Sequence, residues 1–349
     1  MIEQIKSNLD NPNQLEKLYR ENKTTFKKNF NSIYPEIKEN TTAQIWNERL
    51  NFESDEISWG TKNELVFIII ASLFAGFIAK LPQFFGFTEE FFYQRNIAFV
   101  VFPLLAAYFA WKQNTPVKRI VIASIAILVS VLYINLLPNN NQSDTLILAC
   151  LHLPLFLWAV LGFTYLGDDI KNDNRRLDFL RYNGDLVVMT AIILLAGGLF
   201  TALTINLFSL IDIHIEEFYF RNIAIWGLAA APIVGTYLVQ TNPQLVNKVS
   251  PVIAKIFTPF VLVTLVVYLV AVIYTGKDPY NDREFLLIFN LLLVGVMAIT
   301  FFSIAESSKI SSSKITTVML FALSIVTIIV NGIALSAIVF RISEWGITP

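Results

Sequence analysis

Charged residues are scarce in this sequence. Asp, Glu, Lys and Arg make up 15% of the 349 residues, whereas a typical soluble domain carries about 25%. The formal net charge is −1, so the chain as a whole offers no basic surface to a nucleic acid. The low charge argues against a soluble protein, and we expect no nucleic-acid partner.

Residues that commonly bind metals are scarcer still. The single cysteine is Cys150, and the two histidines are His152 and His214. One cysteine cannot form an intramolecular disulfide or a cysteine-based metal cluster. The sequence also lacks a phosphate-binding glycine loop, a Gly-x-Ser-x-Gly turn and a His-Glu-x-x-His pair. We therefore expect no metal site, no cofactor and no ATP-driven transport by this chain alone.

Apolar residues are abundant and are gathered in runs. They make up 55% of the sequence, and the mean hydropathy is +0.57. The runs are about 16 to 26 residues long, close to the ~20 that cross a bilayer as a helix. Each run must be helical, since lipid offers the backbone no hydrogen-bond partner. We predict an all-α, polytopic transmembrane helical bundle with about nine spans, at 65–81, 96–111, 119–137, 145–166, 186–208, 223–239, 251–274, 285–305 and 315–340.

The distribution of basic residues indicates how the chain is oriented. If the N-terminus lies in the cytoplasm, nineteen Lys and Arg residues fall inside and five outside. This orientation is favoured because inner segments carry the excess of basic residues. The first long apolar run begins near Leu65, too late for a cleaved signal peptide. We expect a multi-pass protein of the cytoplasmic (inner) membrane, with Lys80 and Lys255 reaching from span ends toward water.

Residues 1–63 form a polar segment ahead of the first span. Apolar side chains recur there at intervals of four, seven, four and three residues, at Leu15, Tyr19, Phe26, Phe30 and Ile33. This spacing places them on one helical face. We expect that helix to end at Pro35 and a second short helix to begin at Thr42, giving a cytoplasmic amphipathic hairpin. Such a hairpin lies on the membrane, packs on the ends of the spans or binds a protein partner, and its mixed charges favour packing on the protein itself.

A short motif occurs twice in the sequence. Glu89–Ala98 reads Glu-Glu-Phe-Phe-Tyr-Gln-Arg-Asn-Ile-Ala, and Glu216–Ala224 reads Glu-Glu-Phe-Tyr-Phe-Arg-Asn-Ile-Ala. With Phe92 omitted, eight of nine aligned residues are identical. Each copy follows the first span of a four-span group, and the groups cover residues 64–166 and 185–305. Because four is an even number, we expect a parallel duplication with both motifs on the outer side.

The ninth span, 315–340, has no counterpart in the other group, and the residues after it read like the start of another loop. Three segments, Leu15–Arg20, Gly276–Glu284 and Arg341–Gly346, resemble the bacterial polytopic membrane proteins catalogued as domain of unknown function 4153. The resemblance implies a bacterial cytoplasmic membrane and no particular activity. Members of that family commonly continue past the position of Pro349, so we expect a longer protein.

The repeated motif is the strongest candidate for a binding site. Each copy brings two carboxylates and an arginine to the outer side: Glu89, Glu90 and Arg95 in the first, and Glu216, Glu217 and Arg221 in the second. Such a group can bind a cation, a polar headgroup or a sugar, and paired carboxylates also serve membrane transferases as base or metal ligand. The structural alternative is a helix start at Thr88 and at Asp212. Acidic first-turn residues stabilise a helix by ~0.3–1 kcal/mol each, and Glu90 or Glu217 would then pair with the arginine of its own copy.

The one-residue difference between the copies has a geometric consequence. One residue rotates the remainder of a helix by about 100°. The two motifs can therefore present both of their ends alike only if one segment is bent or irregular. We expect either an interfacial turn or two sites that have diverged.

Two further polar residues fall within predicted spans. His152 and Asn290 each lie eight residues after an aspartate, Asp144 or Asp282, that precedes a span. An ionisable group at membrane depth is a functional hypothesis by default. The alternative is a hydrogen bond to a neighbouring helix, worth ~0.6 kcal/mol. Both residues are candidate binding residues near the membrane midplane.

Three hypotheses about function remain open. The leading one is a non-enzymatic protein of transporter-like architecture with a polar site between the two repeats, which requires a polar cavity that reaches the midplane. The second is a membrane scaffold or signalling component that acts through residues 1–63. The third is a membrane-embedded transferase that uses Glu89 or Glu90. The sequence indicates neither a substrate nor an oligomeric state.

Overall fold

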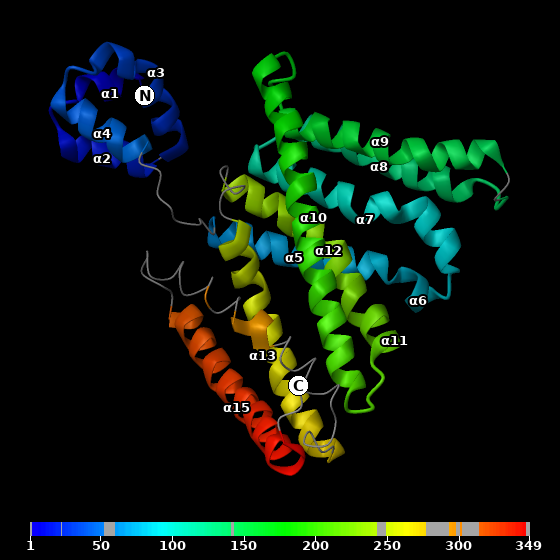
Figure 1. Ribbon diagram of the computed structural model, residues 1–349. Coiled ribbons are helices and arrows are strands. Elements are labelled where there is room, and N and C mark those ends of the chain that lie inside the picture. The colour runs from blue at the N-terminus through cyan, green and yellow to red at the C-terminus, as the bar shows by residue number, and fades with distance from the viewer. Residues whose placement is uncertain are drawn as a thin grey trace. The chain divides into compact units, whose positions relative to one another are not determined.

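The computed structural model describes residues 2–21, 23–51, 60–140, 143–242, 249–276, 293–297, 301 and 314–346 (Figure 1). Within these ranges the chain is helical and contains no β-strand, which confirms the all-α prediction. The chain divides into two compact units, Met1–Glu56 and Ile57–Pro349.

The first unit contains four short helices. They are α1 (Ile2–Ser7), α2 (Pro12–Glu21), α3 (Lys23–Ile37) and α4 (Thr41–Asn51). Asn40 starts α4, because its Oδ1 accepts hydrogen bonds from the backbone N–H groups of Thr42 and Ala43, which the first helical turn leaves without partners. Helix α3 continues through Pro35 to Ile37, so the predicted end at Pro35 is wrong. A proline in the last turn removes only one backbone hydrogen bond, and the helix tolerates the loss.

These four helices enclose a hydrophobic core of their own. Its buried members are Ile5, Leu15, Leu18, Phe26, Phe30, Ile33, Ala43, Trp46 and Leu50. The apolar stripe that predicted an open hairpin therefore faces inward, and Figure 1 shows the helices gathered into one cluster. The two-helix hairpin is wrong because the first predicted helix is divided into α2 and α3, and α1 adds Ile5 to the core.

An ionic network joins α2 to α4 on the surface of this unit. Glu16 pairs with Arg20 at 2.8 Å and with Arg49 at 2.9 Å. The Arg49 guanidinium also lies over the rings of Trp46 and Tyr19. Hydrogen bonds to the carboxylate, first from Arg20 and then from Arg49, lower the pKa of Glu16 below its ordinary value. The network therefore stabilises the unit only while Glu16 is ionised.

We predict that Glu16 makes the first unit sensitive to acid. Since the pKa of Glu16 is lower in the folded unit than in the unfolded chain, its contribution is complete above the unfolded value of about 4.3 and is lost as the pH falls through the folded value. Glu16→Gln should lower the thermal midpoint near neutral pH and flatten its acid dependence, measured by circular dichroism on residues 1–56. The matched variant Glu48→Gln removes an exposed carboxylate of α4; equal effects of the two substitutions would contradict the prediction.

The second unit contains the membrane helices. They are α5 (Lys62–Ala79), α6 (Leu81–Phe85), α7 (Glu89–Lys112), α8 (Val117–Leu136), α9 (Asp144–Leu166), α10 (Asp173–Ser209), α11 (Glu216–Tyr219), the π-helical turn η1 (Phe220–Ala224), α12 (Ile225–Thr241), α13 (Val249–Thr275) and α15 (Lys314–Trp345). Seven helical stretches among the described residues are long and apolar enough to cross a membrane: α5, α8, α9, α10, α11–η1–α12, α13 and α15. They fit a multi-pass integral membrane protein.

These seven stretches do not confirm the predicted count of nine spans. The predicted span 96–111 forms the later part of α7, whose first turns carry Glu89, Glu90 and Arg95 and make the helix more polar than the others. The predicted span 285–305 lies mostly outside the described residues. Each of the remaining seven predicted spans falls on one of the seven helical stretches.

Helix α10 is much longer than its predicted span, 186–208. It begins at Asp173, where Oδ1 of Asn172 accepts a hydrogen bond from the backbone N–H of Asn174. Its 37 residues extend about 55 Å, whereas the hydrocarbon core of a bilayer is about 30 Å thick. The helix therefore extends beyond that core or lies strongly tilted in it. The charged residues Asp173, Arg175 and Arg176, which hydropathy assigned to a loop, form the first turn of α10.

Two groups of helices form most of the membrane unit. Helix α5 packs most extensively on α12, and α12 packs in turn on α10. Gly76 permits the close approach of α5 to α12, since a Cβ there would overlap the indole ring of Trp226. Helices α7, α8 and α9 lie side by side (Figure 1), and α13 contacts α15.

Apolar side chains cover the outer faces of the long helices. Exposed examples on α13 and α15 are Phe260, Val263, Val267, Ile273, Phe321, Ile325, Ile328 and Val339. In water such extended apolar surfaces would promote association. Contact with lipid tails gives them a suitable environment, which agrees with membrane insertion of these helices.

We predict that a methyl group at position 76 separates α5 from α12. Gly76→Ala should lower the thermal midpoint of the detergent-solubilised protein, because overpacking costs roughly 1–3 kcal/mol. Gly198→Ala is the control, since a Cβ on this glycine of α10 meets nothing within 4 Å. The control should leave the midpoint unchanged or raise it slightly, because alanine favours helix. A destabilisation of the same size in both variants would exclude close packing as the cause.

Candidate functional site

The first copy of the motif begins a long helix, as the structural alternative expected. Thr88 has an extended backbone and precedes α7, and Glu89 and Glu90 occupy the first turn with exposed side chains. The positive end of the helix dipole stabilises carboxylates at this position. Gly86, two residues before Thr88, has a left-handed φ of 70°, which lets the chain turn between α6 and α7.

Arg95 carries the positive charge of the first motif into the protein interior. Only 1% of its surface is exposed. Its Nη1 donates hydrogen bonds to the carbonyl oxygens of Ile134 at 2.7 Å and Leu137 at 3.0 Å, and its Nη2 donates to that of Pro138 at 3.2 Å. These carbonyls lie at the end of α8, where the helix dipole is negative. The guanidinium also stacks 4.4 Å from the ring centroid of Phe91. Arg95 therefore joins the start of α7 to the end of α8.

The second copy uses the same residue types differently. Arg221 pairs with Glu217 at 3.1 Å, and 63% of its side chain is exposed. The predicted pairing within a motif is thus confirmed for the second copy. The short helix α11 begins at Glu216 with Ile215 as its N-cap, so the predicted helix start at Asp212 is wrong. Asp212 has a left-handed φ of 57° and turns the chain before the helix begins.

A π-helical turn distinguishes the second copy further. Residues Phe220–Ala224 form η1 between α11 and α12, whereas the corresponding part of the first copy lies in a continuous α-helix. This irregular segment agrees with the expectation drawn from the one-residue difference. Single π-helical turns are uncommon and frequently occur at functional sites. The two motif segments therefore differ in backbone as well as in the burial of their arginines.

The asparagine that follows each arginine also has different partners in the two copies. Asn96 and Asn135 of α8 exchange amide hydrogen bonds of 2.9 and 2.8 Å. Asn222 accepts a hydrogen bond of 2.7 Å from Nζ of Lys80, which is the C-cap residue of α5 and is buried. The prediction that Lys80 reaches toward water is wrong, because Asn222 and the negative end of the α5 dipole stabilise its charge within the protein. The side chain of Lys255 lies outside the described residues.

The hydrogen bond described for His152 joins it to its own helix and not to a motif residue. Its side chain is exposed on α9, and its Nδ1 lies 2.8 Å from the carbonyl oxygen of Leu148, one turn earlier in the same helix. A hydrogen bond within the helix therefore accounts for its ring orientation. Asn290, the other predicted midplane residue, lies outside the described residues.

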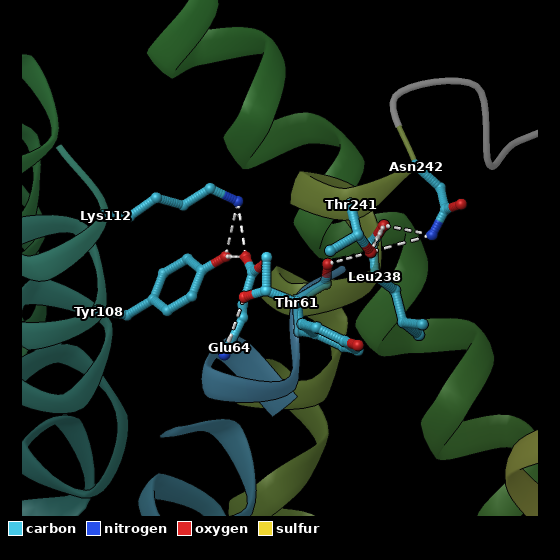
Figure 2. Close-up of polar contacts among 8 residues, drawn as sticks. Thr61, Glu64, Tyr108, Lys112, Leu238, Thr241 and Asn242 are labelled. Atoms are coloured by element: carbon cyan, nitrogen blue, oxygen red, sulfur yellow. Dashed lines mark hydrogen bonds and ion pairs between the residues drawn. The ribbon is translucent and has the colours of Figure 1, made fainter. Parts of the chain in front are cut away.

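A buried carboxylate that the sequence analysis missed lies in the first turn of α5. Oε1 of Glu64 accepts hydrogen bonds from the hydroxyl of Tyr108 at 2.5 Å and from Nζ of Lys112 at 2.7 Å (Figure 2). Lys112 also donates to the Tyr108 hydroxyl at 2.9 Å. We call these three residues the Glu64 cluster. Its ion pair suits both helices, because Glu64 lies at the positive end of α5 and Lys112 at the negative end of α7.

A sequence signal for part of this cluster exists. Thr61-Lys62-Asn63-Glu64 has the Thr-x-x-Glu spacing of a capping box ahead of an apolar run. Thr61 is indeed the N-cap, since its Oγ1 accepts a hydrogen bond from the backbone N–H of Glu64 at 3.2 Å. The signal locates the helix start but not the ion pair. Lys112 lies 48 residues further along the chain, so the fold alone brings the two charges together.

The end of α12 lies on the opposite side of Glu64 from Tyr108 and Lys112. Figure 2 shows Thr61 next to Glu64, with Thr241 and Asn242 beyond Thr61. Gly60 has a left-handed φ of 55°, and a Cβ there would lie 2.6 Å from Oε2 of Glu64 and 2.9 Å from Cγ2 of Thr241. The space around Oε2 therefore admits no further side chain at position 60.

No family model, no curated protein and no solved structure matches this chain. Among the residues that the structure describes, no group of three or more His, Cys, Asp or Glu side chains is placed to hold a metal ion. The Glu64 cluster supplies one carboxylate, one phenol and one ammonium group. These groups can exchange a proton or contact a charged solute.

We predict losses of stability of different size for substitutions of the two motif arginines. Arg95→Met should lower the free energy of unfolding by several kcal/mol, because each buried carbonyl left without a donor costs ~1–3 kcal/mol. Arg221→Met should cost at most ~1 kcal/mol, since exposed ion pairs contribute little. Thermal unfolding of the detergent-solubilised protein measures both. Comparable losses would show that the burial of Arg95 does not distinguish the copies.

Proposed function

We propose that this chain is a membrane protein of transporter-like architecture that moves a small polar or charged solute across the bilayer. The Glu64 cluster carries the proposal, because it is an ion pair buried between helices α5 and α7. Burying an ion costs several kcal/mol, and ionisable groups within membrane helices commonly mark an ion or solute pathway. A second buried cation, Lys80, lies at the other end of α5. Both ends of one helix therefore have polar links to other helices.

The orientation is part of the proposal. The excess of basic residues in the inner segments supports an N-terminus in the cytoplasm. The Glu64 cluster then lies at the cytoplasmic ends of its helices, and both motifs lie at the outer ends. Two parallel four-span repeats, 64–166 and 185–305, are supported by the two motif copies, and the three segments resembling domain of unknown function 4153 support a bacterial inner membrane.

A second candidate function is favoured by the unit Met1–Glu56. This unit has its own hydrophobic core, and domains of this size often fold alone. A separately folded domain can bind a protein partner without any change in the membrane helices. The second candidate is therefore a scaffold or signalling component that acts through the first unit.

The transferase hypothesis has less support from the geometry. Glu89 and Glu90 are exposed, whereas Arg95 turns toward the carbonyls that end α8. The first motif therefore does not present its carboxylates and its guanidinium to one substrate. The exposed charges of the second motif, Glu217 and Arg221, neutralise one another.

We predict that the full chain transports at least one class of small solute when reconstituted in liposomes. Uptake would be measured under imposed proton, sodium, potassium or chloride gradients, with panels of sugars and amino acids. Glu64→Ala should slow uptake at least roughly tenfold, equivalent to ~1.4 kcal/mol in the barrier, because Lys112 loses its counter-charge. Glu217→Ala, which breaks the exposed pair with Arg221, should leave uptake unchanged.

Removal of residues 1–56 separates the two candidate functions. If the protein is a transporter, the shortened chain should still take up solute. If it is a scaffold, the shortened chain should lose its role in the cell, whereas the full-length Glu64→Ala variant should keep that role. The second result, combined with no uptake of any solute by the full chain, would exclude transport and favour the scaffold.

A further inference from the structure

The Glu64 cluster contains one carboxylate and one ammonium group, and both contacts are made through the same carboxylate oxygen. Tyr108 and Lys112 donate to Oε1 at 2.5 and 2.7 Å. The titratable groups close to Glu64 are these two on α7 and Tyr237 on α12, which lies near enough to interact with it electrostatically. On α5 itself, Glu64 is preceded by the exposed Lys62. The charge of the buried pair is therefore balanced as it stands.

The surroundings of the carboxylate restrict what it can bind. Oε2 lies close to Gly60, since a Cβ there would be 2.6 Å from Oε2 and 2.9 Å from the methyl group of Thr241. Mg²⁺ and Ca²⁺ take six or more oxygen ligands, and among the described residues Glu64 belongs to no group of three or more His, Cys, Asp or Glu side chains placed to hold a metal ion. A proton needs only the carboxylate oxygen. The geometry therefore favours a proton over a metal ion.

We propose that Glu64 is a proton-binding site, and that its protonation releases Lys112. The proton comes from the aqueous side and bonds to a carboxylate oxygen of Glu64, so the ion pair becomes a neutral acid beside a lysine that keeps its own proton. The Tyr108 hydroxyl changes from donor to acceptor. The Lys112 side chain can then move into water, because 28% of it is already exposed. The idea that this proton drives transport rests on the proposed function. The idea that Glu64 binds a proton does not.

Protonation would also loosen α5 from α7 at this end. The two hydrogen bonds to Oε1 are polar links between these helices, and the neighbouring apolar link is the stack of Phe67 on Trp111, with ring centroids 5.4 Å apart. A stack is insensitive to protonation of a carboxylate. Proton binding therefore removes the ionic part of the interface and leaves the apolar part.

Labelling of lysine tests the release directly. The full chain in lipid vesicles is treated with an amine-acetylating reagent, and mass spectrometry compares Lys112 with the exposed Lys118 in the same sample. Their ratio cancels the general effect of pH on amine reactivity. In Glu64→Gln, which mimics the neutral acid, the ratio should rise roughly tenfold, since a hydrogen bond to a charged group is worth about that factor. In the wild type the ratio should rise as the pH falls from about 6 to about 2, a range that includes the ordinary glutamate pKa of about 4.3 and the values below it.

Infrared spectroscopy provides a second readout. The wild-type spectrum minus that of Glu64→Gln should contain one carboxylic acid carbonyl band that grows over the same pH range as the labelling ratio. Glu217→Gln, which alters an exposed pair, should leave the labelling ratio unchanged. A ratio that is constant with pH, or a difference spectrum without a titrating carboxyl band, would overturn the proposal even if Glu64→Gln failed to fold, because the wild-type series stands alone.

Neither readout depends on transport. A titrating Glu64 in a chain that transports no solute would support the proton site and contradict the proposed function. Uptake of a solute without titration of Glu64 would support the proposed function and contradict the proton site.

Discussion

The ion pair between Glu64 and Lys112 determines how the membrane helices fit together at one end. Thr61 starts α5 and thereby places Glu64 in its first turn, while Lys112 occupies the last turn of α7. Both charges lie where the helix dipoles favour them, which reduces the cost of burial. Loss of one partner would leave the other buried and unpaired, a change that typically costs ~3–5 kcal/mol. The residues around the pair must therefore leave room for it. Gly60 does so because it has no Cβ, which would lie 2.6 Å from Oε2 of Glu64 and 2.9 Å from Cγ2 of Thr241.

The fold was predictable wherever a local property determines it. An apolar run has to become a helix in lipid, and seven predicted spans fall on seven long helices. Helix ends were less predictable, because charged residues are compatible with a first turn; α7 and α10 extend well into segments that hydropathy assigned to loops. In the first unit the spacing of Leu15, Phe26 and Phe30 identified a buried face correctly. It could not identify α1, whose own pattern is short, or the division of the predicted helix into α2 and α3.

The candidate site was less predictable, because its contacts are formed by residues far apart in the chain. The two motifs made Arg95 and Arg221 alike candidates for binding, but Arg95 is buried against the end of α8, whereas Arg221 forms an exposed pair with Glu217. Lys80 was assigned to water because it falls near the end of a predicted span, and its partner Asn222 lies 142 residues away. Glu64 was placed just ahead of the first predicted span, 65–81, although the capping spacing after Thr61 could have placed it on α5. In each case the sequence identified the charged residue, but not the residue that it contacts in the fold.

The two ends of α5 differ in a way that matters for movement. At one end an ion pair holds the helix to α7, and at the other Lys80 donates to the neutral amide of Asn222 in the π turn η1. A proton can cancel the first link but not the second, since an amide does not titrate in this range. Between them Gly76 receives the ring of Trp226 and fixes α5 against α12. Protonation of Glu64 would therefore free only one end of α5, and the helix would pivot about its contact with α12 rather than slide along it.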